Sequence, residues 1–394
     1  MSLQYLEEID ISSKKVMIRV DYNVPYDSEM NITDDTRIRA TLPTLQYCLD
    51  RDCVLILVSH LGRPKGKIVE SMSLAPVARR ISELTGKDVR LVDENVGEDA
   101  ASVINSLAPG SIALLENIRF YPEEEKNDDD FGRKLASLAD VYINDAFAAS
   151  HRGHASNEAV TRHVPVCGAG FLLRNEIEYF KKALLDPSHP VTAIIGGAKV
   201  STKIDALMFI LPKIDYLIIG GAMPFTFLKA QGYETGNSLV EDEHLTTALQ
   251  ILEAADKNGV SVILPDDVVV SSAFDDESDF RTVPADSIPP EMEGVDVGED
   301  TLARYREIIN SSRTIIWNGP VGAFEIDSFA KGTFAVAQYL AESGALTLVG
   351  GGDTVSAVNK SGYAEKMSYI STGGGAFLEL LEGKTLPAIA ALER

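Results

Sequence analysis

The sequence predicts an α/β protein with two parallel β-sheets, one in each of two domains. Ten short apolar runs alternate with longer segments of helical spacing, which is typical of buried parallel strands joined by helices. Ten strands would be many for a single sheet, and 394 residues are many for a single domain. We therefore expect two domains, each with its own sheet, and a cleft between them.

The composition is that of a globular protein, and its charge argues against some classes of binding partner. Hydrophobic residues make up 45% of the chain and charged residues 24%, and the formal net charge of −23 argues against nucleic acid and anionic membranes. The N-terminal segment is acidic and has no apolar core, and every apolar run is strand-sized, so neither a signal peptide nor a membrane span is predicted.

Three cysteines, Cys48, Cys53 and Cys167, occur in the chain, and none forms a CxxC pair. Their odd number and their spacing fit a reducing cytosol and argue against a zinc site or a disulfide framework. We therefore expect a cytoplasmic protein.

The first half of the chain contains four of the strand-sized runs, at 16–20, 54–58, 112–115 and 141–143. Segments 36–51 and 73–86, which lie between the runs, have helical spacing. Two acidic and weakly patterned segments, one in each half of the chain, are predicted to be solvated loops: 123–130 and 274–280.

A domain boundary is predicted near 165–190. Segment 165–173 contains Pro and Gly, an amphipathic helix is predicted over 175–186, and the sequence DPSHP ends it. This helix is the candidate connector between the domains. The second half then contains six further apolar runs, at 191–195, 216–220, 260–264, 314–317, 346–350 and 367–371.

Ligands of parallel α/β sheets bind at the carboxyl ends of the strands, so the residues after each run indicate the chemistry. In the first half these residues are polar and often basic. Arginine side chains bind carboxylate and phosphate in a bidentate manner, so their gathering in an acidic protein predicts a small polyanionic ligand. For His60 two interpretations stay open, a hydrogen bond to that anion or simple packing. The residues concerned are Asp21, Tyr22, Asn23, Arg37, His60, Leu61, Gly62, Arg63, Arg119 and Arg152.

In the second half the strand ends are glycines. Glycine lets backbone N–H groups approach a phosphate, and a helix N-terminus beyond it adds a favourable dipole. The glycine-rich ends are Gly196-Gly197, followed by Lys199; Gly220-Gly221; Gly350-Gly351-Gly352, followed by Asp353 and Thr354; and Gly373-Gly374-Gly375. They predict a nucleotide polyphosphate with Mg²⁺. Because there is no GxxxxGK[ST] motif and no GxGxxG after the first strand, neither a P-loop enzyme nor a dinucleotide site is favoured.

An anion pocket in one half and a phosphate cradle in the other indicate phosphoryl transfer across a cleft. This chemistry depends on positioning and charge neutralisation more than on covalent help from the protein. The sequence motifs also resemble the phosphoglycerate kinase family, in order and over nearly the whole chain. They are RVDYNVP (19–25), DDTRIRATLPTL (34–45), SHLGRPKG (59–66), LLENIRFYPEE (114–124), NDAFAASHRGHAS (144–156), GGAKVSTKI (196–204), WNGPVGAFE (317–325), VGGGDTVSA (349–357) and STGGGAFLELLEGK (371–384).

The resemblance implies reversible, Mg²⁺-dependent phosphoryl transfer from 1,3-bisphosphoglycerate to ADP, which gives 3-phosphoglycerate and ATP. It implies two Rossmann-like domains and a monomer. Residues 1–170, with the tail 387–394, would bind 3-phosphoglycerate. Residues 171–386 would bind the nucleotide and begin with a connecting helix at about 172–186. The domains would close about a hinge near 172–178, with help from the segment before Pro387.

The resemblance also implies roles for individual residues. The ten residues named above would form the 3-phosphoglycerate site. Lys199 would follow the migrating phosphoryl group, Lys203 would contact phosphate, Glu325 the ribose, and Asp353 would lie on the metal side. The catalytic set would be Arg37, Lys199, Gly351 and Gly374. The nucleotide site would comprise Gly197, Lys199, Lys203, Gly221, Asn318, Pro320, Glu325, Gly350, Gly351, Gly352, Asp353 and Thr354.

Three positions depart from the family's common pattern: Ala148, Pro224 and the segment 174–176. None of them is a proposed catalytic side chain. In the reverse direction the nucleophile is a carboxylate, which is already ionised at pH 7, so no general base is required. Two other hypotheses remain, a non-catalytic nucleotide-binding protein on the same fold and a kinase for a different small acid; an assay of 3-phosphoglycerate against other acids distinguishes them.

Overall fold

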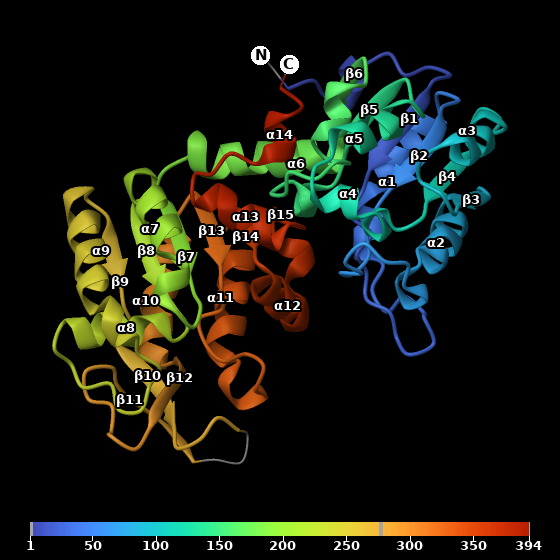
Figure 1. The fold of residues 1–394 in the computed structure, drawn as a ribbon. Helices are drawn as coiled ribbons and strands as arrows, with labels where there is room; N and C mark the ends of the chain where they lie inside the picture. The colour runs from blue at the N-terminus through green and yellow to red at the C-terminus, as the bar shows by residue number, and fades with distance from the viewer. Residues whose placement is uncertain (1–2, 276–278, 394) are drawn as a thin grey trace. The chain divides into compact units, whose positions relative to one another are not determined.

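The computed structural model describes residues 3–275 and 279–393, and the chain divides into two compact units. The first comprises residues 1–177 and 385–394, and the second comprises 178–384. Each unit contains one six-stranded parallel sheet with flanking helices, which confirms the predicted α/β class (Figure 1). Within the described part of the chain, no helix combines the length and the hydropathy that crossing a membrane requires.

The sheet of the first unit has the strand order β3-β4-β2-β1-β5-β6. Its central strand β1 pairs in parallel with β2 and β5, so that Met17 lies opposite Ile56 and Tyr142. The strands are Lys15–Arg19 (β1), Val54–Val58 (β2), Val89–Val92 (β3), Ile112–Leu115 (β4), Val141–Asn144 (β5) and Val166–Ala169 (β6). The helices are Thr36–Leu49 (α1), Ala75–Thr85 (α2), Glu98–Asn105 (α3), Pro122–Glu125 (α4), Asp129–Ala136 (α5) and Pro387–Ala390 (α14).

The sheet of the second unit has the order β15-β14-β13-β7-β8-β9. Its strands are Val191–Ile195 (β7), Tyr216–Ile219 (β8), Ser261–Ile263 (β9), Thr314–Asn318 (β13), Leu346–Gly350 (β14) and Tyr369–Ile370 (β15). The helices are Ile204–Ile210 (α7), Met223–Ala230 (α8), Leu245–Lys257 (α9), Glu299–Ser311 (α10), Lys331–Glu342 (α11), Gly352–Ser361 (α12) and Gly374–Leu381 (α13). Pro224 lies in the first turn of α8, where its missing N–H leaves no helical hydrogen bond unmade.

Both sheets are buried on their two faces, which is why their strands read as continuous apolar runs. In β2 every residue is buried, and in β13 Trp317 is fully enclosed in the core of the second unit. The four runs at 54–58, 112–115, 191–195 and 346–350 coincide with β2, β4, β7 and β14.

Five strands were not predicted. β3 and β6 add to the first sheet, and a separate antiparallel sheet of order β11-β10-β12 lies in the second unit. β3 is a partly exposed edge strand, so it lacks a continuous apolar run. The strands of the small sheet are Asp267–Ser271 (β10), Phe280–Pro284 (β11) and Glu293–Val297 (β12).

The prediction that 123–130 is a solvated loop is wrong. The segment spans the end of α4 and the start of α5, and Glu124 is fully buried. Asp128 begins α5 by accepting a hydrogen bond from the Phe131 N–H at 2.8 Å, and Pro122 occupies the first turn of α4. The charges of this segment therefore serve helix starts and a buried contact. The other predicted loop, 274–280, lies partly outside the described residues, and Phe280 begins β11.

The connecting helix is α6, Phe171–Phe180, and a π-helical turn over Lys181–Leu185 continues it. The helix thus starts earlier than the predicted 175–186. Two of its first N–H groups are satisfied by side chains of the first unit: Thr44 Oγ1, in α1, accepts from Phe171 at 3.0 Å, and Asp145 Oδ1, after β5, accepts from Leu173 at 3.1 Å. The start of α6 is therefore anchored to the first unit.

Candidate active site

The first unit gathers polar side chains at the carboxyl ends of β1, β2, β4 and β5. Asp21 follows β1 and accepts a hydrogen bond from Nη1 of Arg37 at 2.8 Å. The Nδ1 atom of His60 lies 3.9 Å from the other carboxylate oxygen. Burial raises the pKa of the Asp21 carboxyl, but the guanidinium groups of Arg37 and Arg19 help to bring it below its ordinary value, so it stays ionised.

His60 is buried, and its ring faces arginines. Nη2 of Arg19 lies 3.3 Å from Nδ1. Burial and then the charges of Arg19, Arg119 and Arg152 hold the pKa of His60 well below its ordinary value, although Asp21 opposes them. Because a guanidinium can only donate, Nδ1 is the acceptor and the neutral ring carries its proton on Nε2. That N–H is a hydrogen-bond donor suited to an anion.

Arg119 is a buried cation with an unused donor. Its side chain is 4% exposed, and Nη1 donates to the carbonyl of Gly62 at 2.8 Å. Within the described residues, its Nε has no hydrogen-bond partner, because Glu125 lies 3.6 Å away. Burial, followed by repulsion from Arg152 and Arg19, lowers the pKa of Arg119 to about 10. The site therefore carries positive charge that its own carboxylates do not balance.

Two residues beneath this cluster were not predicted from the sequence. Nε of Arg19 donates to Oγ of Ser156 at 2.8 Å, and Ser156 donates in turn to Glu124 at 2.6 Å. Arg19 and Glu124 are buried and form the charged floor of the site. The available signal was an arginine inside the apolar run 16–20, because a charged residue within a buried strand needs a buried partner.

The remaining predicted residues of the first unit contribute mainly backbone. The Gly62 N–H donates to Oδ1 of Asn23 at 2.9 Å, and Asn117 holds Leu61 through hydrogen bonds of 3.2 and 2.7 Å. The phenol of Tyr22 is buried and hydrogen-bonds to Thr41, so only the backbone of this residue faces the strand ends. The exposed Arg63 follows Gly62 in the chain, but within the described residues its side chain makes no hydrogen bond or ion pair.

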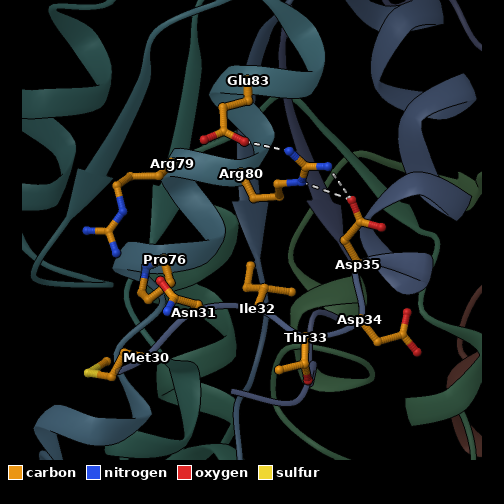
Figure 2. A pocket seen from close by; sticks show the side chains of 10 residues that line it. All are labelled: Met30, Asn31, Ile32, Thr33, Asp34, Asp35, Pro76, Arg79, Arg80 and Glu83. Atoms are coloured by element: carbon orange, nitrogen blue, oxygen red, sulfur yellow. Dashed lines mark hydrogen bonds and ion pairs between the residues drawn. The ribbon is translucent and has the colours of Figure 1, made fainter. Parts of the chain in front are cut away.

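A pocket of about 530 Å³, lined by the 30–35 loop and α2, lies beside the start of α1, which carries Arg37 (Figure 2). Arg80 of α2 donates to Oδ2 of Asp35 at 2.9 and 2.8 Å and pairs with Glu83. Asp35 directly precedes α1, and its carbonyl accepts from Ile38. The ion pairs therefore fix the first turn from which Arg37 projects.

In the second unit, glycines meet at the point where the strand order reverses, between β7 and β13. A Cβ added to Gly196 would lie 2.0 Å from the carbonyl oxygen of Pro320, and one added to Gly319 would lie 2.0 Å from that of Gly196. Gly221, with φ of +70°, would place a Cβ 2.5 Å from the Gly197 carbonyl. The three strand-end loops thus touch backbone to backbone, in the crevice where α/β sheets bind ligands.

Two helix N-termini converge beside these loops. A Cβ added to Gly374, at the start of α13, would lie 3.5 Å from the backbone nitrogen of Gly352, at the start of α12. Oγ1 of Thr354 accepts from the Gly319 N–H at 2.7 Å, which ties α12 to the loop after β13. The starts of α12 and α13 therefore lie close together, and the N–H groups and dipoles of two neighbouring helix starts favour phosphate.

Few side chains complete this site. Lys203 donates from Nζ to Oδ1 of Asn318, whose Nδ2 donates to the Gly350 carbonyl at 2.9 Å. Burial lowers the pKa of Lys203, against the attraction of Glu382 and Asp353. Lys199 and Glu325 are exposed, and Lys199 makes no side-chain hydrogen bond or ion pair within the described part of the chain.

The candidate nucleotide site offers one carboxylate, that of Asp353, as a metal ligand. Asp353 is exposed in the first turn of α12, and no group of three or more His, Cys, Asp or Glu side chains in the described residues could hold a metal ion. A single carboxylate fits Mg²⁺, which keeps several waters and is held chiefly by nucleotide phosphates. It does not fit a metal that needs a full set of protein ligands.

Comparisons with known proteins agree with this arrangement. The family model described as phosphoglycerate kinase matches residues 6–384. A phosphoglycerate kinase of Citrifermentans bemidjiense is 52% identical over 394 residues, covering 100% of this chain and 99% of the relative. The structure of phosphoglycerate kinase from Coxiella burnetii is 41% identical with a TM-score of 0.93 and covers 99% of both chains. That from Pyrococcus horikoshii OT3 is 30% identical with a TM-score of 0.83, over 99% of this chain and 98% of the other.

Proposed function

The chain belongs to the phosphoglycerate kinase family, and on that premise we propose how its two units share the reaction. The family's reaction is phosphoryl transfer from 1,3-bisphosphoglycerate to ADP, which gives 3-phosphoglycerate and ATP in glycolysis. The acceptor in the reverse direction is a carboxyl group, so the chain is a phosphotransferase of that class.

The first unit binds 3-phosphoglycerate or 1,3-bisphosphoglycerate through its basic side chains. The observation that carries this proposal is Arg119, a buried cation that repels Arg152 and Arg19 and whose Nε makes no hydrogen bond within the described residues. A phosphate group would accept from that Nε and from the Nε2–H of His60, and its charge would relieve the repulsion. Asn23, Arg37 and Arg63 would hold the rest of the substrate, with Asp21 fixing the orientation of Arg37.

The second unit binds ADP or ATP on backbone N–H groups. A Cβ built on Gly374 would lie only 3.5 Å from the backbone nitrogen of Gly352. This closeness supports a phosphate position at the starts of α12 and α13. Lys203 and Asn318 would contact phosphate oxygens, and the loops at Gly197, Gly221 and Pro320 would face the nucleoside, with Glu325 at the ribose. These assignments are proposals for the individual residues.

Mg²⁺ would be held beside Asp353 and the nucleotide phosphates, where it supplies neutralising charge during transfer. The chain's own contribution is positioning. The substrate carboxylate is ionised at pH 7, so no residue has to remove a proton. Lys199 has no side-chain partner within the described residues and is able to follow the phosphoryl group, while Arg37 neutralises charge on the acid substrate.

The two ligands belong to different units, so transfer requires them to be brought together. In-line transfer needs reacting atoms about 3–3.5 Å apart. We propose closure about a hinge near 172–178 with help from the segment before Pro387. The crossings of the chain between the units, at 177/178 and 384/385, support that position, because each lies at or beside a proposed hinge segment.

A coupled assay with 3-phosphoglycerate and ATP, run beside other small acids, tests the activity. Turnover of another acid at a comparable rate would contradict the proposed specificity, and absence of turnover would favour a non-catalytic binding protein. Small-angle scattering tests the closure. The radius of gyration should be smaller with 3-phosphoglycerate and ADP together than with either alone, and single-ligand complexes that are already as compact would overturn the proposed gating.

A further inference from the structure

Two of the three cysteines lie at opposite ends of one turn. Cys48 is in the last turn of α1, and Cys53 directly precedes β2. Both are fully buried at the edge of the first unit's core. All three cysteines of the chain are thiols in this structure.

The turn between them is a Schellman motif. The Cys53 N–H donates to the Cys48 carbonyl at 3.3 Å, and the Asp52 N–H donates to the Leu49 carbonyl at 3.1 Å. Asp52 has the left-handed φ of 55° that this motif requires at its fifth position. In this motif the first and sixth side chains pack against each other, and here both of them are cysteines. Both cysteines also belong to the same buried core cluster.

We propose that Cys48 and Cys53 are a redox-active dithiol that forms a reversible disulfide when the protein meets a hydroperoxide. The helix-ending motif holds the two sulfur atoms together in the reduced protein, so little backbone movement is needed to join them. In a reducing compartment such a disulfide is expected to be transient and to sense oxidants. It is not expected to stabilise the fold.

The chemistry balances with the hydroperoxide as oxidant. The Cys53 thiolate attacks one peroxide oxygen, the O–O bond breaks, and the departing hydroxide takes a proton to become water, which leaves Cys53 as a sulfenic acid. The Cys48 thiol then attacks the Cys53 sulfur, the S–O bond breaks, and a second water leaves with the remaining proton. Two thiols are oxidised by two electrons, and hydrogen peroxide is reduced to two waters.

The surroundings suit this order of events. The interaction between the two neighbouring thiols raises the pKa of Cys48 and lowers that of Cys53, so Cys53 is the better nucleophile. Cys53 Sγ also donates to the Ile11 carbonyl at 3.0 Å. That carbonyl accepts from the Lys14 N–H at 3.0 Å as well, so it keeps a hydrogen bond after the thiol proton is lost. Oxidation therefore leaves no unsatisfied buried acceptor.

Access is the slow step, because neither thiol is exposed. The turn above them carries the exposed Asp50 and Asp52, and opening of this one turn would uncover both sulfur atoms. We expect oxidation of the folded protein to proceed over minutes and without loss of the rest of the fold. Cys167 is in β6 and outside this turn, so it provides an internal control.

Peptide mapping of the full chain tests the proposal, because trypsin cuts between the two cysteines after Arg51 and does not cut at Arg63, which precedes Pro64. After treatment with hydrogen peroxide under native conditions and alkylation with N-ethylmaleimide, we expect peptide 40–51 linked to peptide 52–65. The intact mass should fall by about 2 Da, the two hydrogen atoms lost, and dithiothreitol should restore it.

The link should persist in Cys167→Ser and be absent in Cys53→Ser, whose hydroxyl can still donate to the Ile11 carbonyl. Irreversible addition of oxygen to one cysteine, a link that involves Cys167, or no oxidation of the folded protein would each overturn the proposal. The wild-type result is decisive by itself, so the test does not depend on the folding of a variant.

Discussion

The candidate site of the first unit is made of charged side chains, whereas that of the second unit is made mostly of backbone. In the first, His60 and Arg119 are buried, as are Arg19 and Glu124, which form the charged floor. In the second, glycine loops touch backbone to backbone and two helix N-termini converge. We propose that both sites bind anions. The first uses cationic side chains, and the second uses backbone N–H groups.

The difference follows from the ligands. A small acid with a phosphate group needs several donors directed at one compact charge, and arginine forks supply them. A nucleotide polyphosphate is long and must lie close to the protein, and N–H groups at glycine positions allow that approach without a side chain in between. The first site should therefore be sensitive to the loss of charge, and the second to the addition of volume.

The largest loss of activity is expected at Lys199, a charged side chain in a site that is otherwise built mostly of backbone. Lys199→Ala should lower kcat by about 100- to 1000-fold and change either KM much less, because its contact strengthens only as the phosphoryl group moves. Steady-state kinetics with both substrates measure this. A variant that keeps more than about a tenth of the wild-type kcat would show that the backbone alone carries the transfer.

Adding volume to the second site should be the next most costly change. Gly221→Ala forces an alanine into a φ of +70° and places its Cβ 2.5 Å from a backbone oxygen, so we expect a loss of about 2–4 kcal/mol in unfolding free energy. Urea titration followed by fluorescence of Trp317, the single tryptophan and a core residue of this unit, reports it.

Gly259→Ala is the matched control for this prediction. Gly259 has a φ of +71° but no heavy atom within 4 Å of an added Cβ, so it carries the backbone strain without the clash. Equal losses in the two variants would mean that the close approach of the Gly197 and Gly221 loops does not matter.

Replacing a guanidinium by an ammonium group in the first site should lower its activity, because the hydrogen-bonding geometry changes while the charge stays. Arg37→Lys keeps the positive charge but loses the fork that donates to Asp21 at 2.8 Å. We expect kcat/KM for 3-phosphoglycerate to fall by about 30- to 100-fold, with the KM for ATP little changed. Near-normal turnover would mean that this site uses Arg37 as a point charge only.

A smaller and pH-dependent effect is expected from one buried aspartate in each unit. Burial raises the pKa of Asp145 and of Asp296 to about 7, from an ordinary value of 3.8. The folded protein then binds more protons than the unfolded chain, so stability should fall as the pH rises from about 4 to about 7 and level off above that. Substitution by asparagine should flatten this slope for the unit concerned.

The two asparagine variants should differ at pH 8. Both oxygens of Asp296 accept backbone N–H groups, from Gly332 at 2.7 Å and Val297 at 2.9 Å, so Asp296→Asn should lose about 1–2 kcal/mol. Asp145 uses Oδ1 for Leu173, while Oδ2 has no hydrogen-bond partner in the described residues, so Asp145→Asn should cost less. Trp317 fluorescence follows the second unit, and hydrogen exchange at Leu173 follows the start of α6; a larger loss at Asp145 would contradict this comparison.

The sequence alone was sufficient for the elements in which burial dictates the type of residue along one continuous segment. Strands such as β2 and β7 match their apolar runs, because a strand buried on both faces has to be continuously apolar. The residues after those runs, from Asp21 to Gly374, could be named as site candidates because strand ends of a parallel sheet meet at one edge. Their individual roles remain predictions.

Tertiary structure decided what depends on contacts between distant segments. Glu124 belongs to a strongly acidic segment, yet it is buried because Ser156 donates two hydrogen bonds to it. Arg19 faces His60, 41 residues away, and the starts of α12 and α13 converge across 22 residues of chain. Local patterns carry no information on such pairs, because desolvation of a charge is compensated only by the partners that the completed fold brings to it.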